Sequence, residues 1–245
     1  MVDSERLAAT VGRLDCDVVA LQEVDRCTRR VGEVDQPALI SGATGAEVRF
    51  ARAIDVAGGE YGIALAARVG FEQSIVLPLP GAGEPRVALL ALVGPSVRDV
   101  DARSAGGADG SASASASASA DASASVSANA DAGVGWAIGC THLSTATGDA
   151  VLQLRTVLQE LESFADGRPA VLLGDLNLGP RHVAPVIASA GWMAAPSGPT
   201  HPAIRPRRRI DWVLARRASV AGSWVVSERG SDHRPLVADL RPKER

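Results

Sequence analysis

The sequence contains few cysteines, lysines or aromatic residues, and each shortage excludes a class of protein. Cys16, Cys27 and Cys140 are the only cysteines and form no C-x-x-C pair, so neither a disulfide framework nor a cysteine zinc site is expected. Lys243 is the only lysine, and the formal net charge is -3, which argues against a generally basic nucleic-acid scaffold but not against a local basic groove. Aromatic residues make up 3% of the chain and leave few platforms on which bases could stack.

Long apolar runs are also missing, so no segment is expected to span a membrane. The first residues lack the basic and apolar regions of a signal peptide. The chain as given is therefore expected to be cytoplasmic. Secretion is not excluded if the true N-terminus lies further upstream.

What the chain does contain is enough apolar sequence for a full core. At 245 residues and 46% hydrophobic content, it has the composition of a soluble globular protein with one large or two small domains. Helical spacing of apolar residues predicts helices near 7–14 and 150–164, and short strands at 50–56, 61–67, 72–77 and 86–93 predict an antiparallel meander.

Residues 98–133 form a Ser/Ala-rich segment with no apolar face in either the helical or the strand period. Ordering it would cost conformational entropy with little burial to offset it, so we expect a disordered loop insertion. Strand-like sequence stands on both sides, at 87–93 and 136–140. The insertion is therefore expected to lie within a single domain that spans 1–245.

The run 171–174 reads as a buried strand that is followed by two polar residues, Asp175 and Asn177. Residues two apart on extended backbone point to the same side, so these two side chains can share one pocket. A carboxylate beside an amide suits a hard cation or a phosphate. An ordinary turn explains the same pair equally well, since both residue types are common where strands end.

Further polar residues stand at other predicted strand ends. Carboxylates there can hold Mg²⁺ or Mn²⁺, and an imidazole can move a proton or donate to a phosphoryl oxygen. Each residue alone also has a structural interpretation, as a solvated strand exit, a core histidine or a turn cap. His182 and His201 lie in loops without partner spacing and are expected to be structural or surface residues. The set that could act together is Glu23, His142, Asp175, Asn177, Asp211, Asp232 and His233.

Five blocks of sequence, taken in order, carry a specific resemblance. They are Leu21-Gln22-Glu23-Val24-Asp25, Thr141-His142-Leu143, Gly174-Asp175-Leu176-Asn177, Arg209-Ile210-Asp211-Trp212-Val213 and Ser231-Asp232-His233-Arg234-Pro235-Leu236. Their order along the chain resembles that of the endonuclease/exonuclease/phosphatase superfamily, which includes DNase I and the exonuclease III type of apurinic endonuclease. A further segment, Tyr61-Gly62-Ile63-Ala64-Leu65, resembles the family's "YGNA" strand.

The resemblance implies an α/β fold, of the α+β kind: a four-layer sandwich of two mixed β-sheets flanked by helices. It also implies metal ligands. Glu23 would bind Mg²⁺ or Mn²⁺, and Asp232 would be an additional ligand or would position a histidine.

The catalytic roles follow from the same resemblance. His233 would activate water or stabilise the phosphorane, with its ring held by Asp211. Asp175 would orient or deprotonate the attacking water. Asn177 and His142 would donate hydrogen bonds to the phosphoryl group.

The chain departs from the family pattern at its beginning. Members normally start with a strand that ends in an Asn, whereas this chain starts in the following helix, and Ile63 replaces the Asn of "YGNA". A missing interior strand leaves backbone groups unpaired unless something else covers them. Two explanations are open: a start placed too far downstream, or a decayed copy with weakened metal binding.

The leading hypothesis is thus a divalent-metal-dependent hydrolase of phosphoester bonds, acting through in-line attack of an activated water. The alternative is a catalytically weakened relic that binds phosphate or nucleotide. The substrate class stays open among nucleic acid, nucleotide and lipid or small phosphodiester, and a monomer without an obligate protein partner is expected. The basic run 205–209 could contact phosphates or could be an ordinary solvated loop.

Overall fold

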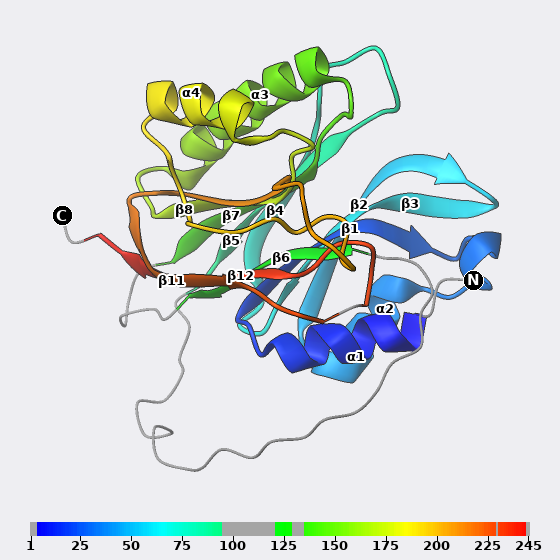
Figure 1. Cartoon of the computed structure of the whole chain (residues 1–245). Coiled ribbons are helices and arrows are strands. Elements are labelled where there is room, and N and C mark those ends of the chain that lie inside the picture. Colours follow the sequence, from blue (N-terminus) through cyan, green and yellow to red (C-terminus); the bar gives the residue numbers. More distant parts are fainter. Residues whose placement is uncertain (1–3, 95–120, 129–134, 229, 244–245) are drawn as a thin grey trace, which may run out of the picture.

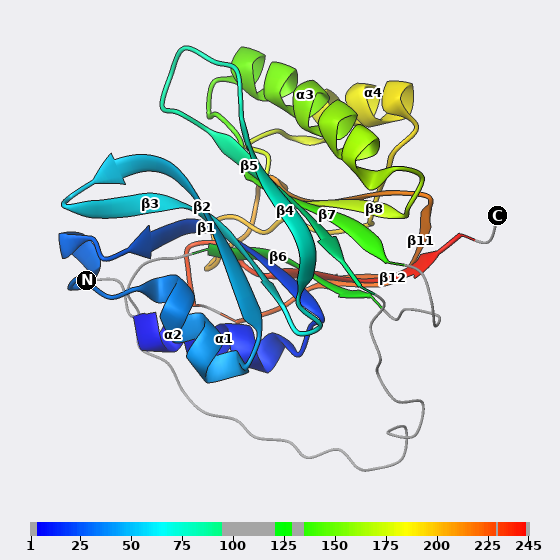
Figure 2. The ribbon, with the colours of Figure 1, turned by 180° about the vertical axis from the view of Figure 1, so that it is seen from behind.

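The computed structural model describes residues 4–94, 121–128, 135–228 and 230–243. Two six-stranded sheets pack face to face, with one pair of helices on each outer side (Figure 1). The view from behind shows the same four layers (Figure 2). This is the four-layer α/β sandwich that the family resemblance implied, so the predicted fold class is confirmed.

Each sheet contains strands from both halves of the chain. The first sheet has the order β11(Ala218–Val225), β12(Leu236–Pro242), β6(Asp121–Ala128), β1(Val18–Arg26), β3(Gly59–Ala67), β2(Glu47–Val56). The second has the order β4(Phe71–Pro78), β5(Val87–Val93), β7(Trp136–His142), β8(Ala170–Asp175), β10(Asp211–Arg216), β9(Met193–Ala194).

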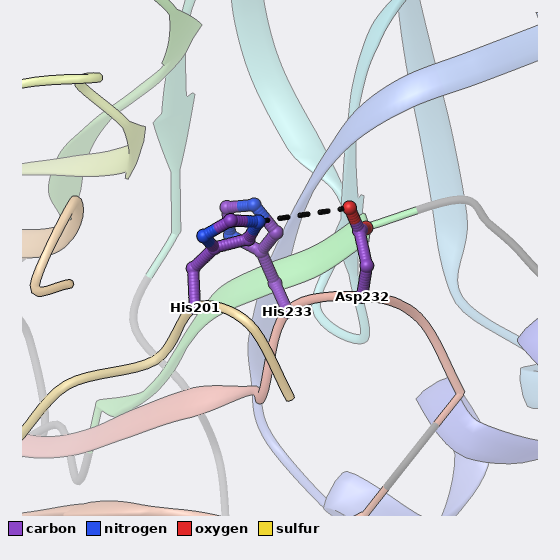
Figure 3. A group of neighbouring side chains, drawn as sticks. All are labelled: His201, Asp232 and His233. Carbon is purple, nitrogen blue, oxygen red and sulfur yellow. Dashed lines mark ion pairs between the residues drawn. The ribbon is translucent and has the colours of Figure 1, made fainter. Parts of the chain in front are cut away.

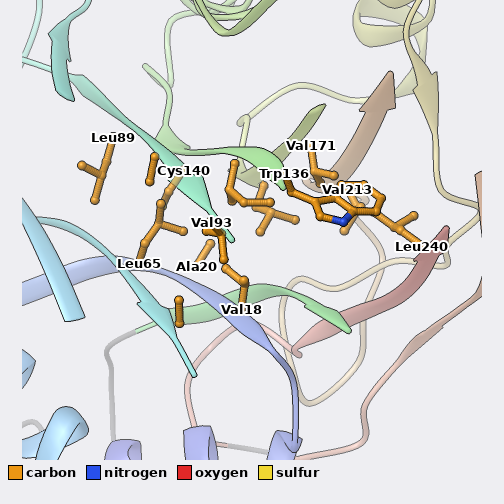
Figure 4. Packing of buried hydrophobic residues seen from close by; sticks show 14 of the residues in the cluster. Val18, Ala20, Leu65, Leu89, Val93, Trp136, Cys140, Val171, Val213 and Leu240 are labelled. Atoms are coloured by element: carbon orange, nitrogen blue, oxygen red, sulfur yellow. The ribbon is translucent and has the colours of Figure 1, made fainter. Parts of the chain in front are cut away.

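The main core lies between the sheets, where both contribute small and branched apolar residues (Figure 4). Every residue of β5 and β7 is buried, as expected for central strands that are covered on both faces. The continuous apolar runs in the sequence therefore correspond to strands in the middle of the sandwich. Leu65, Leu89, Trp136 and Val213 are examples from both sheets.

The helices cover the outer faces. α1(Ser4–Leu14) and α2(Gln36–Thr44) pack on the first sheet, and α3(Thr147–Ala165) and α4(Pro180–Ala190) on the second. A short 3-10 helix, η1(Arg29–Val31), follows β1. The α3 stripe, which includes Leu154, Leu158 and Leu161, is fully buried. Burying one such leucine stabilises the fold by roughly 1.5–3 kcal/mol before entropy is counted.

The Ser/Ala-rich segment differs from its predicted disorder over Asp121–Ala128, where the structure has strand β6. This strand pairs antiparallel with β1 and parallel with β12. A position between two strands offers two rows of unpaired backbone groups, and any extended chain can satisfy them through its own backbone. Pairing therefore does not require an apolar face on β6. The rest of the predicted insertion, 98–120 and 129–133, lies outside the described residues.

Strand register brings the polar strand ends together. β7 and β8 run parallel with His142 opposite Asp175, and β8 and β10 run antiparallel with Asp175 opposite Asp211. Gly174 allows this close approach, because its φ is 148° and an added Cβ would lie 1.9 Å from the carbonyl oxygen of Thr141. Three of the predicted site residues thus occupy neighbouring positions on adjacent strands.

Within the ranges that the structure describes, no helix has the length and apolarity required to cross a lipid bilayer.

Candidate active site

His233 and Asp211 form the best-defined contact in the site. The Nδ1 atom of His233 lies 3.0 Å from Oδ1 and 2.9 Å from Oδ2 of Asp211. The Asp211 side chain is fully buried and also accepts a hydrogen bond from the hydroxyl of Thr200. The His233 backbone N–H donates to the Ser231 hydroxyl at 2.9 Å. These contacts fix the ring and direct Nε2 towards Asp175, whose Oδ2 lies 3.9 Å away.

Asp175 lies at the end of β8, between two imidazoles. Its Oδ2 is 3.9 Å from Nε2 of His233 and 3.8 Å from Nε2 of His142. Burial and then the negative charge of Asp211 raise the pKa of Asp175 above its usual range. A carboxylate with a raised pKa is a better proton acceptor, which is what abstraction of a proton from water requires.

His142 is held in its neutral form. Burial lowers its pKa to about 3, and the positive charges of Arg86 and His233 act in the same direction. A neutral imidazole can donate one hydrogen bond without adding a charge. His142 is therefore suited to a polar contact with an oxygen and not to ion pairing.

Asn177 turns out of the strand with a left-handed backbone, φ 51°. Its backbone N–H donates to Oδ1 of Asp175 at 2.7 Å, and its Nδ2 donates to the carbonyl oxygen of Leu143 at 3.0 Å. The amide is thus fixed in orientation, and its second N–H hydrogen is available to a ligand. The contact between the Asn177 N–H and the Asp175 carboxylate is the one that an ordinary Asx turn makes, so the role of this pair in a site stays a prediction.

Glu23 lies on β1, where the pairing register with β3 shifts between Leu21 and Val24. Its φ is 56°, and its pKa is raised by burial and by the negative charge of Asp232, while a hydrogen bond from Tyr61 acts in the opposite direction. Glu23 is partly buried, whereas Asp232 is exposed, and a divalent cation would offset the repulsion between the two carboxylates. Among the described residues, two groups have ligand atoms within 4.8 Å of one another and could hold a metal: His201 with Asp232 and His233, and Asp175 with Asp211 and His233. Glu23 belongs to neither group, so its part in a metal site stays a prediction.

Three contributors to this site were not singled out as functional in the sequence. Tyr61 holds Glu23. Arg86 has a side chain only 13% exposed, and its buried Nε has no hydrogen-bond partner. Its sequence context, directly before β5, gives no hint of His142 nearby. Only the tertiary fold places it there.

His201, which we expected to be a structural or surface residue, is the third and lies beside His233 and Asp232 (Figure 3). Its ring packs against that of His233 with centroids 4.6 Å apart and the planes tilted by 50°, and its Nε2 lies 3.9 Å from Oδ2 of Asp232. The Thr-His-Pro loop that carries it is pinned by backbone hydrogen bonds to Arg208. The neighbouring Thr200 ties the same loop to Asp211 through its hydroxyl.

All seven predicted site residues thus lie at the same end of the sandwich. Five of them are linked by hydrogen bonds, close contacts or strand register: His142, Asp175, Asn177, Asp211 and His233. The charges of Asp232 and His233 both act on the pKa of Glu23. Asp232 directly precedes His233 in the sequence. The roles assigned to these residues stay predictions.

Comparison with known proteins places this geometry in context. A family model described as "Endonuclease/Exonuclease/phosphatase family" matches residues 2–233. The crystal structure of an endonuclease/exonuclease/phosphatase from Beutenbergia cavernae DSM 12333 is similar at TM-score 0.69 and 25% identity, covering 99% of this chain and 67% of that chain. A search of curated proteins found no match.

Two other solved structures share the fold at lower identity. The human Nocturnin catalytic domain with bound sulfate anion has TM-score 0.65 and 18% identity, covering 98% of this chain and 87% of that chain. D. rerio TDP2 complexed with single strand DNA product has TM-score 0.62 and 18% identity, covering 95% of this chain and 93% of that chain.

Proposed function

The chain belongs to the endonuclease/exonuclease/phosphatase family, and we propose that it hydrolyses a phosphoester bond by in-line attack of water with the help of a divalent cation. The family is generally hydrolytic on phosphoester bonds. The observation that carries the proposal for this chain is the arrangement of His233 between Asp211 and Asp175.

Asp175 is the proposed base. Its raised pKa lets it take a proton from the attacking water, and the hydrogen bond from the Asn177 N–H fixes the other oxygen of the same carboxylate. The proton leaves the water as the new P–O bond forms, and the leaving-group oxygen departs on the opposite side of phosphorus.

His233 acts on the phosphoryl group. Asp211 binds its Nδ1 and stabilises a positive ring, so Nε2 presents an N–H to the oxygen on which negative charge develops. Asn177 and the neutral His142 donate further hydrogen bonds to the same group. Such donors stabilise the transition state most when they are fixed before the reaction.

Glu23 and Asp232 are the proposed ligands of Mg²⁺ or Mn²⁺. A divalent cation bound there would polarise the phosphoryl oxygens and offset their charge. Burial and then the negative charge of Asp232 raise the pKa of Glu23, and a bound cation would favour the ionised carboxylate. Tyr61 keeps the Glu23 carboxylate oriented through its hydroxyl.

A non-catalytic phosphate-binding protein is the second candidate. Ile63 stands where the family pattern has an Asn, is 3% exposed and packs in the core between the sheets. An apolar residue there removes one polar group from the neighbourhood of the metal ligands. This candidate predicts phosphate binding without turnover.

Turnover of bis(p-nitrophenyl) phosphate distinguishes the two. We expect p-nitrophenolate release with Mg²⁺ or Mn²⁺, none with a chelator, and a loss of about 100-fold or more in Asp175→Asn and His233→Asn. Glu160→Gln, an exposed change on α3, is the matched control. Phosphate binding without any release would favour the second candidate, and equal release by the wild type and both variants would exclude the proposed site.

A further inference from the structure

A basic pocket adjoins the candidate active site. It has a volume of about 360 Å³ and shares Asn177 with the catalytic centre. Its charged lining comes from the start of α4 and from the run before β10, and no carboxylate lines it. The residues that matter are Arg181, His182, Arg207, Arg208 and Arg209.

Three of these arginines have free guanidinium groups. Among the residues that the structure describes, Arg181, Arg207 and Arg208 are exposed and make no ion pair or side-chain hydrogen bond. Several arginines elsewhere are paired, as Arg52 is with Asp55 and Arg68 with Asp15. The net charge of the chain is -3, so the cluster does not simply reflect a basic protein.

Arg209 has a different role. It donates to the carbonyl oxygen of Ala195 at 2.8 Å and stacks over the ring of Trp212 at 3.9 Å. Burial lowers its pKa. Arg209 therefore forms the back of the pocket and keeps the start of β10 in place.

Hydrogen bonds hold the backbone of the segment that carries Arg207 and Arg208. The Arg207 and Arg208 N–H groups both donate to the carbonyl oxygen of His201, at 2.9 and 2.8 Å, and the Thr200 N–H donates to the carbonyl oxygen of Arg208 at 2.9 Å. On the other side, Arg181 stands in the first turn of α4, where the helix dipole favours an anion. The positive charges of these arginines therefore surround one pocket in the structure as it stands.

We propose that this pocket binds a second, uncleaved phosphate of the substrate, next to the phosphoryl group that is hydrolysed. This rests on the proposed function and names its substrate class: phosphoesters that carry a further phosphate group. One guanidinium group can donate two parallel hydrogen bonds to a phosphate, and Arg181 and Arg207 reach the pocket from two different segments of the chain. Asn177, which lines the pocket, would contact both phosphates or lie between them.

Two substrates that differ by one phosphate test the proposal. They are thymidine 5′-(p-nitrophenyl phosphate) and the same compound with a 3′-phosphate. We expect the wild-type chain to hydrolyse the second with a kcat/KM at least about tenfold higher, equivalent to about 1.4 kcal/mol. In Arg181→Gln/Arg207→Gln this ratio falls towards one.

The matched control is Arg155→Gln/Arg205→Gln. It removes the same charge, and Arg205 belongs to the same basic run, but neither residue lines the pocket. The control is expected to keep the tenfold ratio. Equal kcat/KM values for the two substrates in the wild type, or an equal loss of the ratio in the control, would overturn the inference.

Metal-free binding separates this inference from the proposed function. Calorimetry with inorganic pyrophosphate is expected to show binding that is at least tenfold weaker in the pocket variant than in the control. That result supports the pocket even if bis(p-nitrophenyl) phosphate is not turned over. Turnover of bis(p-nitrophenyl) phosphate with equal pyrophosphate affinity in both variants overturns the pocket alone.

Discussion

The Nδ1 atom of His233 lies 2.9 Å from Oδ2 of Asp211, and its other ring nitrogen points towards Asp175. The two carboxylates come from adjacent positions on β10 and β8, whereas the histidine arrives on the loop before β12, from the other sheet. One imidazole thus joins the two halves of the sandwich at the proposed site.

Acid destabilises this fold partly through His142. The pKa of His142 is lowered to about 3 in the folded protein, whereas in the unfolded chain it is near 6.5. The unfolded state therefore gains the proton first, and stability is lost as the pH falls below 6.5. Between pH 7 and pH 5, His142→Gln should lose roughly 2 kcal/mol less unfolding free energy than the wild type.

Urea unfolding at the two pH values measures this difference. The Arg155→Gln variant, an exposed change on α3, serves as the control and should follow the wild type. The same pH dependence in His142→Gln and the wild type would show that His142 titrates normally.

Asp175 should limit stability at high pH. Its pKa is raised in the folded state, so the folded state holds the proton more tightly, and the stabilisation is lost as the pH rises through the raised pKa. Asp175→Asn removes the buried charge and should raise the unfolding free energy at pH 8 by about 1–2 kcal/mol, with a smaller gain at pH 5. Thermal unfolding at both values checks this, and a larger gain at pH 5 would reverse the assigned direction.

Metal binding should depend on Glu23. We expect Mn²⁺ to raise the melting temperature of the wild type and to have at most a small effect on Glu23→Gln, because the stabilisation by a ligand follows its affinity for the folded state. Glu160→Gln, an exposed glutamate on α3, should respond like the wild type. Equal Mn²⁺ shifts in all three proteins would place the metal elsewhere.

Strand β6 should contribute backbone pairing. Ala124 is the register partner of Ala20 on β1 and of Leu236 on β12. Ala124→Pro removes an N–H from the middle of a sheet and should lower stability by about 3 kcal/mol, whereas Ala124→Ser keeps that N–H and should be nearly neutral. Chemical denaturation of both variants gives the comparison, and an unchanged midpoint in the proline variant would contradict the pairing.

Much of the sandwich could be predicted because its central strands leave a strong local signal. The runs that became β5, β7 and β8 are mostly apolar, and β7 and β8 end in the polar residues His142 and Asp175. Five ordered blocks then placed Glu23, His142, Asp175, Asp211 and His233 at one end. Strand β6 left no such signal, since a Ser/Ala repeat acquires its place only from neighbouring strands with unpaired backbone groups.

The residues near the site that the sequence did not single out also depend on tertiary contacts. Arg86 and His201 act through partners far away in the sequence, so no local spacing could identify them. Tyr61 belongs to the segment that resembles the "YGNA" strand, but nothing in that segment indicates its contact with Glu23. Backbone hydrogen bonds to Arg207 and Arg208 hold His201 in position. Residues of this kind become visible only when the chain is folded.

The pH dependence of kcat/KM in Asp211→Asn tests the central claim most directly, with bis(p-nitrophenyl) phosphate and Mn²⁺ and with the wild type beside it. Asp211 raises the pKa of Asp175 and orients His233. The variant should therefore lose activity by about 100-fold or more, and the acid limb of its profile should move to lower pH. A profile with the same acid limb and an unchanged rate would contradict the account.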